Sequence, residues 1–401
     1  MCLWAESLPG KEIIDEKIFS AIALLAVAIM CVACNSDNSS FSENSANTSQ
    51  YQNSTVQQTT ISEEEKAEKR IDNLISSMTV EEKVGQLFFV RYPDTYAEEQ
   101  VSEYNLGGYI LFGKDFDEKT REEITENISS CQKSAEIPFL IGVDEEGGTV
   151  VRVSSNENLR ETPFLSPRDT FANGGWNAIE KDASEKADLL LSLGINVNLA
   201  PVCDVTLDYN AFMYDRSFSG DADEVSEFVK KVVEISGQKK LGTVLKHFPG
   251  YGNNEDTHTG IAYDDRDFHS LEETDFKPFT VGIKSGADCV LVSHNIVNSI
   301  DSEYPASLSE EAHNILRNQL RFDGVIMTDD LSMGAITDYT GTENAAVLAI
   351  KSGNDLLCCS DVEEQYPAVL SSVQSGDIPI EQINNSVKRI LKWKQKLGLI
   401  E

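Results

Sequence analysis

The sequence predicts an α/β fold, a (β/α)8 TIM-like barrel that forms a single catalytic domain. Eight short apolar runs predict strands, and most are apolar on both faces, as strands of a buried parallel sheet are. Helical patterns lie between these runs, and eight strands alternating with helices indicate a barrel. An open doubly wound sheet is the alternative, because periodicity does not show closure. No Gly-X-Gly-X-X-Gly follows the first strand, which disfavours a dinucleotide-binding sheet.

Strands and helices are predicted in alternation along the domain. Thr79 and Glu82 form a capping box, which predicts the start of a helix. The predicted strands are residues 84–90, 108–112, 139–144, 195–200, 243–247, 289–294, 324–329 and 355–359. Further helices are predicted around an apolar stripe at residues 225–232, at 183–193 before Gly194, and at 309–320, 343–351 and 381–397.

Residues 1–34 are predicted to be a lipoprotein-type signal peptide or anchor. Residues 18–34 form a long apolar run that is short for a membrane span and typical of a signal-peptide core. The run ends at Cys34, in a context that resembles a bacterial lipoprotein cleavage site with this cysteine as the lipidated residue. An acidic leader departs from the usual pattern, so an uncleaved anchor is the alternative. We therefore expect an extracytoplasmic protein, either a membrane lipoprotein or secreted.

Residues 35–62 are dominated by Ser, Asn, Thr and Gln, a composition that buries too little apolar surface to fold. They are predicted to be a disordered linker ahead of the catalytic domain at 63–401. The chain carries 33 Lys and Arg against 67 Asp and Glu, a net charge of −34. Such a surface repels phosphate backbones, so we expect no nucleic-acid partner.

Five cysteines fall in the predicted domain, and their number is odd. They are Cys131, Cys203, Cys289, Cys358 and Cys359. Three of them lie inside apolar runs, so most are expected to be small buried side chains rather than a disulfide framework. The adjacent pair at 358 and 359 points to opposite faces of a strand, which argues against pairing.

Residues 246–260 predict a catalytic loop, because two of the five histidines stand there beside acidic residues in a Gly- and Asn-rich segment. In an extended segment Asp256 and His258 project to the same side, so the carboxylate can bind one ring nitrogen and leave the other to move a proton. A solvated turn is one alternative. A metal site of His247, Asp256 and His258 is another, disfavoured because no closely spaced ligand pair accompanies it. We expect no metal and no cofactor.

Polar residues also stand at the ends of other predicted strands, where barrel enzymes carry their chemistry. These strand ends contain Asp144 to Gly148, Lys246 and His247, Ser293 to Asn295, and Thr328 to Asp330. Carboxylates, histidines and a lysine in this arrangement suit acid/base and nucleophilic work on a hydroxyl-rich substrate. Each has a structural alternative: Asp144 as a cap, His294 as a satisfied buried histidine, and one of Asp329 and Asp330 turned away from the other.

The same residues resemble the β-N-acetylglucosaminidases (β-hexosaminidases) of glycoside hydrolase family 3. The matching segments are 78–86, 142–148, 198–204, 215–218, 246–250, 256–258, 305–309 and 324–333, in order over most of the predicted domain. One departure is Tyr251, which stands where many members have a second histidine. The chain also ends soon after the helix that follows the eighth strand, so we expect no second domain of the kind from which the β-glucosidase branch draws its acid/base.

The resemblance implies a retaining hydrolase that forms a covalent glycosyl-enzyme intermediate. Asp329 matches the nucleophile, and His258, oriented by Asp256, matches the general acid/base. The residues that match the sugar-binding positions are Asp144, Arg216, Lys246 and His247. Asp329 then attacks the anomeric carbon while His258 protonates the departing oxygen, and His258 later deprotonates water.

The implied substrate is a terminal, non-reducing, β-linked N-acetylglucosamine, with peptidoglycan fragments containing N-acetylmuramic acid as the natural source. The expected partners are this carbohydrate and, through the N-terminal lipid or anchor, a membrane; the expected state is a monomer. Alternatives are a β-N-acetylglucosaminide phosphorylase, since a histidine acid/base repels phosphate less than a glutamate does, and a β-glucosidase-type hydrolase of the same family. A catalytically silent lipoprotein that binds cell-wall sugars is the alternative from another class.

Overall fold

The computed structural model describes residues 62–252, 260–340 and 344–401, all within the compact unit Thr60–Glu401. The predicted lipidation residue Cys34 and the predicted acid/base pair Asp256 and His258 lie outside the described residues. Within those residues, no helix is both long and apolar enough to cross a bilayer.

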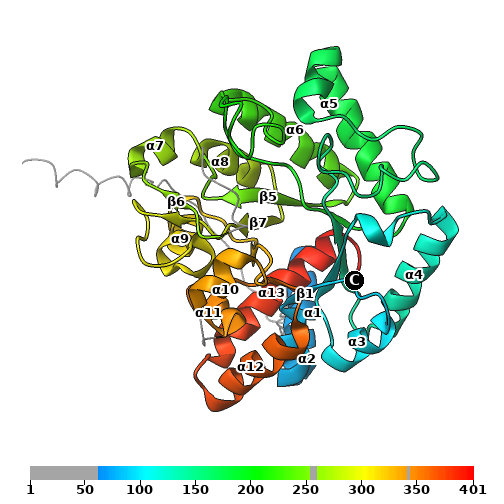
Figure 1. Cartoon of the computed structure of the whole chain (residues 1–401). Coiled ribbons are helices and arrows are strands. Elements are labelled where there is room, and N and C mark those ends of the chain that lie inside the picture. Colours follow the sequence, from blue (N-terminus) through cyan, green and yellow to red (C-terminus); the bar gives the residue numbers. More distant parts are fainter. Residues whose placement is uncertain (1–61, 253–259, 341–343) are drawn as a thin grey trace, which may run out of the picture. The chain divides into compact units, whose positions relative to one another are not determined.

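The described residues form eight parallel strands that close into a barrel (Figure 1). The strands are β1 (Phe88–Arg91), β2 (Gly108–Leu111), β3 (Leu140–Val143), β4 (Val197–Asn198), β5 (Gly242–Phe248), β7 (Cys289–Val292), β9 (Val325–Thr328) and β10 (Leu357–Cys359). Their order is β10-β1-β2-β3-β4-β5-β7-β9. A parallel bridge between Met327 and Leu356 joins the two ends of this order. The predicted barrel is therefore confirmed, and the open sheet is excluded.

Helices surround the sheet, as Figure 1 shows. They are α1 (Glu63–Ser77), α2 (Val80–Gln86), α3 (Ala97–Tyr104), α4 (Arg121–Ser134), α5 (Pro167–Ser192), α6 (Ala222–Gln238), α7 (Phe268–Glu273), α8 (Phe276–Lys284), α9 (Glu310–Asn314), α10 (Gly334–Thr340), α11 (Ala345–Ser352), α12 (Val362–Ser375) and α13 (Ile380–Lys396). Short 3-10 turns span Gly113–Asp115 and Ala306–Leu308, and a π-helix spans Ile315–Gln319. A separate two-stranded ribbon pairs β6 (Tyr263–Asp264) with β8 (Ile296–Val297).

The first predicted strand began too early. The capping box is present: the Thr79 side chain accepts from the Glu82 amide, and the Glu82 carboxylate accepts from the Thr79 amide at 2.7 Å. It starts α2, which continues through Gln86, so residues 84–86 belong to a helix and β1 begins at Phe88. The helix predicted at 183–193 is likewise only the end of α5, whose helical backbone is interrupted at Gly174 and Gly175.

The barrel interior is filled by apolar side chains that alternate along the strands. Phe89, Leu140, Leu291 and Met327 belong to this inner cluster. Helix α13 adds Ile390 and Trp393 to it, and Leu397, the residue directly after this helix, belongs to the same cluster. The five described cysteines are buried and free, as predicted. Cys358 faces the barrel interior while Cys359 packs in the outer cluster under the helices, which confirms that the pair faces opposite ways.

Helix α13 buries a lysine side chain in the protein interior. Lys394 is fully buried, and its Nζ donates to Gln86 Oε1 at 2.6 Å. Burial lowers the pKa of Lys394 to about 7. In the unfolded chain the pKa of this amine is about 10.4. Between pH 7 and this value the unfolded chain binds a proton at Lys394 and the folded protein does not. Protonation therefore favours unfolding, and this penalty is largest at pH 7 and below.

We expect Lys394→Met to raise the free energy of unfolding at pH 7 by about 2–4 kcal/mol, after the lost bond to Gln86 is counted. The gain should shrink by about 1.4 kcal/mol for each pH unit above 7. Urea unfolding of both proteins at pH 7 and pH 9 measures it. A variant that is less stable than the parent at pH 7 contradicts this account of Lys394.

Candidate active site

Four of the predicted site residues lie together at the carboxyl ends of neighbouring strands. Asp144 directly follows β3, Lys246 and His247 lie near the carboxyl end of β5, and Arg216 comes from the loop between β4 and α6. Because parallel strands point their carboxyl ends to one rim of the barrel, residues distant in sequence converge there. Within the described residues this rim carries the candidate active site.

Lys246 joins two carboxylates. Its Nζ lies 2.5 Å from Asp144 Oδ1 and 2.7 Å from Glu146 Oε1. Arg216 binds the same Glu146 with two donors, Nη2 to Oε1 at 2.7 Å and Nε to Oε2 at 2.9 Å. Such a two-pronged pair fixes the guanidinium in position. Glu146 thus bridges the two cations.

His247 is held by a carboxylate on one side and a cation on the other. Its Nδ1 lies 2.8 Å from Asp204 Oδ2, and its Nε2 lies 3.1 Å from Arg216 Nη2. A guanidinium nitrogen only donates, so Nε2 accepts and Nδ1 carries the proton that Asp204 receives. Asp204 also accepts the backbone N–H groups of Tyr251 at 2.8 Å and His247 at 3.2 Å. The imidazole therefore has one orientation and one tautomer.

Electrostatics keep Glu146, Lys246 and Asp204 ionised. Burial alone raises the pKa of Glu146, but the charges and hydrogen bonds of Arg216 and Lys246 outweigh it and hold that pKa well below its usual range. Burial opposes the charge of Lys246 as well, yet Asp144 and Glu146 raise its pKa. Asp204 has a lowered pKa, because His247 and the backbone donors outweigh its burial. Among the residues that form ion pairs with Lys246, Asp144 has the more exposed side chain, at 15% against 3% for the lysine. Its carboxylate is placed to accept hydroxyl groups.

Asp329 and Asp330 follow β9 and have different environments. The Asp330 carboxylate accepts from the Ser332 amide at 2.9 Å, from the Ser332 hydroxyl at 2.8 Å and from the Ser360 hydroxyl at 2.6 Å. It holds the turn after the strand. Asp329 Oδ1 accepts the Asp330 amide at 2.9 Å. One of the two neighbouring aspartates is therefore committed to structure, as expected, and it is Asp330.

Asp329 directly follows β9 and Asp144 directly follows β3, so both stand at the carboxyl ends of barrel strands, although these strands are not neighbours in the sheet. Burial raises the pKa of the Cys358 thiol inside the barrel, and the carboxylates of Asp330, Asp329 and Asp144 raise it further. A thiol feels these charges only when they lie nearby. The predicted nucleophile and the predicted sugar-binding carboxylate therefore share this rim.

The predicted acid/base pair falls in the segment 253–259, outside the described residues. The described residues next to it lie at the rim: Tyr251 is buried, and its ring contacts that of His247 edge-on at 5.2 Å between centroids. Tyr251 thus packs against a predicted sugar-binding residue. No group of three His, Cys, Asp or Glu side chains among the described residues is arranged to hold a metal ion. The alternative metal site of His247, Asp256 and His258 includes two residues that lie outside the described part of the chain.

Two residues of the cluster were not predicted as site residues. Glu146 and Asp204 both occur in segments that carried the family resemblance, but neither was assigned a role. Glu146 is 70 residues from Arg216, and Asp204 is 43 residues from His247. Adjacent acidic residues such as Asp144, Glu145 and Glu146 are a usable signal, because buried carboxylates require cations or hydrogen-bond donors nearby. Here Asp144 and Glu146 pair with cations, whereas Glu145 accepts from backbone amides and from the Ser154 hydroxyl.

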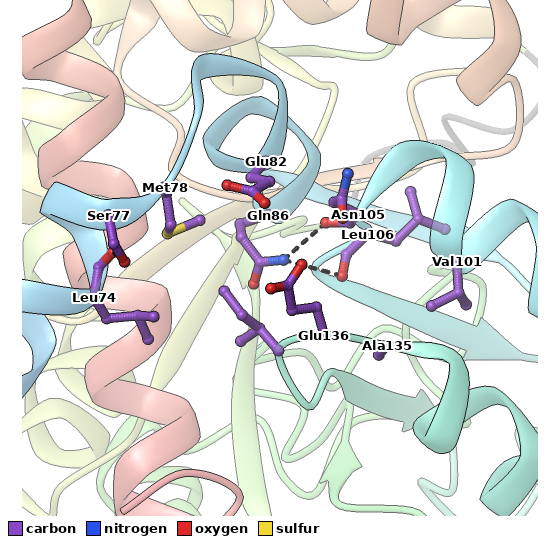
Figure 2. A pocket seen from close by; sticks show the side chains of 11 residues that line it. Leu74, Ser77, Met78, Glu82, Gln86, Val101, Asn105, Leu106, Ala135 and Glu136 are labelled. Atoms are coloured by element: carbon purple, nitrogen blue, oxygen red, sulfur yellow. Dashed lines mark hydrogen bonds between the residues drawn. The ribbon is translucent and has the colours of Figure 1, made fainter.

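Cavities lie at both ends of the barrel. One of about 260 Å³ is lined by Leu74, Met78, Gln86, Leu106 and Ile137. Figure 2 shows Gln86 in it with its hydrogen bonds; its amide donates to the carbonyl groups of Asn105 and Leu106 at 2.8 and 3.3 Å. These residues precede β1, β2 and β3, so this cavity lies opposite the rim.

A second cavity, of about 730 Å³, lies on the rim side of the barrel. Val205 and Gly252 line it, one residue beyond Asp204 and Tyr251. The side chains of the charged cluster do not line this cavity.

A closed barrel with ionised carboxylates and cations at its carboxyl rim defines a barrel enzyme. The family model described as the glycosyl hydrolase family 3 N terminal domain matches residues 79–393. The chain belongs to glycosyl hydrolase family 3.

Three similar proteins illustrate the relationship. The chain is 31% identical over 327 residues to β-hexosaminidase A of Pseudoalteromonas piscicida, covering 75% of this chain and 55% of that protein. It is 34% identical over 305 residues to β-hexosaminidase of Idiomarina loihiensis, covering 74% and 88%. The solved glycoside hydrolase family 3 β-N-acetylglucosaminidase from Paenibacillus sp. str. FPU-7 superposes with a TM-score of 0.75 at 30% identity, covering 80% of this chain and 63% of that one. The chain thus spans about half the length of the first of these relatives.

Proposed function

We propose that this protein is a retaining exo-β-N-acetylglucosaminidase that removes a terminal, non-reducing, β-linked N-acetylglucosamine. The observation that carries the proposal is the cluster of Asp144, Lys246, Arg216 and His247 on the same rim as Asp329. The names of the similar proteins, β-hexosaminidase and β-N-acetylglucosaminidase, support the same sugar and linkage.

The sugar-binding cluster suits a pyranose with adjacent hydroxyl groups. Asp144 accepts hydroxyl protons, while Lys246 and Arg216 donate to hydroxyl oxygens. Because Glu146 and Asp204 fix the cations and the imidazole beforehand, the sugar meets donors and acceptors that need little reorganisation. This orientation presents the anomeric carbon to Asp329.

The reaction proceeds in two displacements. An oxygen of the Asp329 carboxylate forms a bond to the anomeric carbon as the bond to the leaving oxygen breaks, and His258 gives its proton to that oxygen. Water then attacks the same carbon, His258 takes a proton from the water, and the Asp329 carboxylate leaves. Asp256 holds the imidazole in the tautomer and charge that both steps require.

Assay of the purified protein with chromogenic glycosides tests the substrate. We expect the β-N-acetylglucosaminide to be cleaved with a kcat/KM at least about a hundredfold above that of the β-glucoside, since a site built for one polar substituent rejects analogues that lack it. Analysis of products formed in phosphate buffer should show free N-acetylglucosamine. Sugar 1-phosphate as the main product makes the protein a phosphorylase, and a preference for the β-glucoside contradicts the proposed sugar.

The natural substrate is proposed to be a peptidoglycan fragment in which N-acetylglucosamine is linked to N-acetylmuramic acid. A lipid at Cys34 or an N-terminal anchor keeps the enzyme near such fragments, outside the cytoplasm. Mass spectrometry of digested muropeptides and of the mature N-terminus tests both parts; intact disaccharides after digestion contradict the first, and an unmodified Cys34 the second.

A further inference from the structure

A fully buried histidine stands between the strand ends that carry the site. His294 lies two residues beyond β7 and has no exposed surface. Its Nε2 lies 3.0 Å from the backbone carbonyl oxygen of Asp330, and its Nδ1 lies 2.8 Å from the hydroxyl of Ser307. The histidine therefore bridges the end of β7 and the turn that follows the proposed nucleophile.

The partners of His294 determine its tautomer. A carbonyl oxygen only accepts, so Nε2 carries the proton and donates it to Asp330; Nδ1 then accepts from the Ser307 hydroxyl. Ser307 is itself fixed, because its amide donates to the Ser293 carbonyl at 3.0 Å and its own carbonyl accepts from Asn354 at 2.7 Å. The imidazole is thus held at both nitrogens by groups that have other bonds.

Hydrogen bonds at two consecutive residues, Asp329 and Asp330, join this turn to the end of β7 and to the segment just after it. The Asp329 amide donates to the Val292 carbonyl at 3.1 Å, and the Asp330 carbonyl accepts from His294. Between these two attachments lies the Asp330 amide, which points at Asp329 Oδ1. Fixing the backbone on both sides of this amide fixes the direction of the N–H that holds the carboxylate.

We propose that His294 is a positioning residue for the Asp329 carboxylate, a role that rests on the proposed function. Its Nε2–H donor holds the Asp329–Asp330 turn at the distance and angle that in-line attack requires. Misplacement of a reacting group by about 1 Å costs about a hundredfold in rate. The sugar-binding cluster comes from β3, β5 and the loop before α6, so loss of this donor should lower kcat while KM changes little.

Two amide substitutions separate the donor from the packing. A glutamine amide nitrogen reaches the position of Nε2, whereas an asparagine amide reaches only that of Nδ1. We expect His294→Asn to lower kcat for the β-N-acetylglucosaminide at least about tenfold with KM within about threefold, and His294→Gln to restore kcat to within about threefold of the parent. Ser307→Ala, which removes the hydroxyl held by Nδ1, should give an intermediate kcat.

His313 provides a matched control. It is buried to 4% exposure in α9, and its Nδ1 donates to the Ser309 carbonyl at 2.7 Å, the bond that a glutamine there cannot keep. We expect His313→Gln to lower the urea midpoint, as His294→Asn does, but to leave kcat unchanged. Urea midpoints measured beside kcat and KM for all four variants distinguish positioning from general loss of structure.

The possible failures are distinct. If the parent enzyme is labelled at Asp329 by a fluorinated substrate and His294→Asn keeps its kcat, the role of His294 is overturned while the proposed function stands. Equal losses in the asparagine and glutamine variants also overturn it, because packing then explains the effect. A label on a residue other than Asp329 overturns both proposals. If the asparagine variant does not fold, an unchanged kcat in Ser307→Ala overturns the role.

Discussion

Asp329→Asn is expected to lower kcat for β-N-acetylglucosaminide hydrolysis by at least about 10⁴-fold. The amide cannot form the glycosyl ester, so the first displacement stops, while the charged cluster that binds the sugar is unchanged. Substrate binding, measured as quenching of intrinsic fluorescence or by calorimetry, should therefore stay within about threefold of the parent. Steady-state assays with a chromogenic substrate give the kcat.

The neighbouring aspartate is the control for that substitution. Asp330→Asn changes the same functional group one residue away, but the Asp330 carboxylate is bound to Ser332 and Ser360 rather than presented to the substrate. We expect a moderate loss of stability and a kcat within about tenfold of the parent. Comparable loss of kcat in both variants, with both folded, contradicts the assignment of Asp329 as nucleophile.

The second large effect is expected at Glu146, although this residue takes no direct part in the proposed reaction. Glu146→Gln removes the carboxylate that Arg216 and Lys246 share, and leaves two buried cations with less counter-charge. Breaking a buried ion pair in this way costs about 3–5 kcal/mol of unfolding free energy. The sugar-binding side chains lose their fixed geometry as well, so kcat/KM should fall about a hundredfold. Urea unfolding at pH 7 and initial rates measure the two effects.

The pH dependence of this effect has a definite sign. The pKa of Glu146 is held well below its usual range, so its stabilisation is complete above the ordinary glutamate pKa of about 4.3. It is lost only as the pH falls below that value toward the lowered one. The stability difference between parent and Glu146→Gln should therefore be constant from about pH 8 to pH 5 and shrink below about pH 4. A difference that grows on acidification is incompatible with the described ion pairs.

The fold could be predicted because buried parallel strands have a strong sequence signal. Each of the eight predicted ranges overlaps an observed strand, since apolar side chains on both faces distinguish such strands from amphipathic elements. The error in the strand ranges, at residues 84–86, arose because α2 is short and its last turn is buried, so this turn reads as one run with the buried residues of β1. The ribbon of β6 and β8 was not predicted, because strands of two residues have no periodicity to detect.

The candidate site was only partly predictable. The family resemblance named Asp144, Arg216, Lys246 and His247, and the structure brings these four together. It could not assign Glu146 or Asp204, because their partners are determined by which strand ends are neighbours in space. The pairing of Asp256 with His258 stays a prediction, as these residues lie outside the described part of the chain.

Trapping with a fluorinated β-N-acetylglucosaminide tests the central claim most directly. Such a substrate slows the second displacement, so the glycosyl ester accumulates on the nucleophile and survives proteolysis. Peptide mass spectrometry is expected to place one sugar on Asp329, with no label in the Asp329→Asn variant. A sugar attached to any other residue, or turnover without a covalent intermediate, contradicts the proposed mechanism.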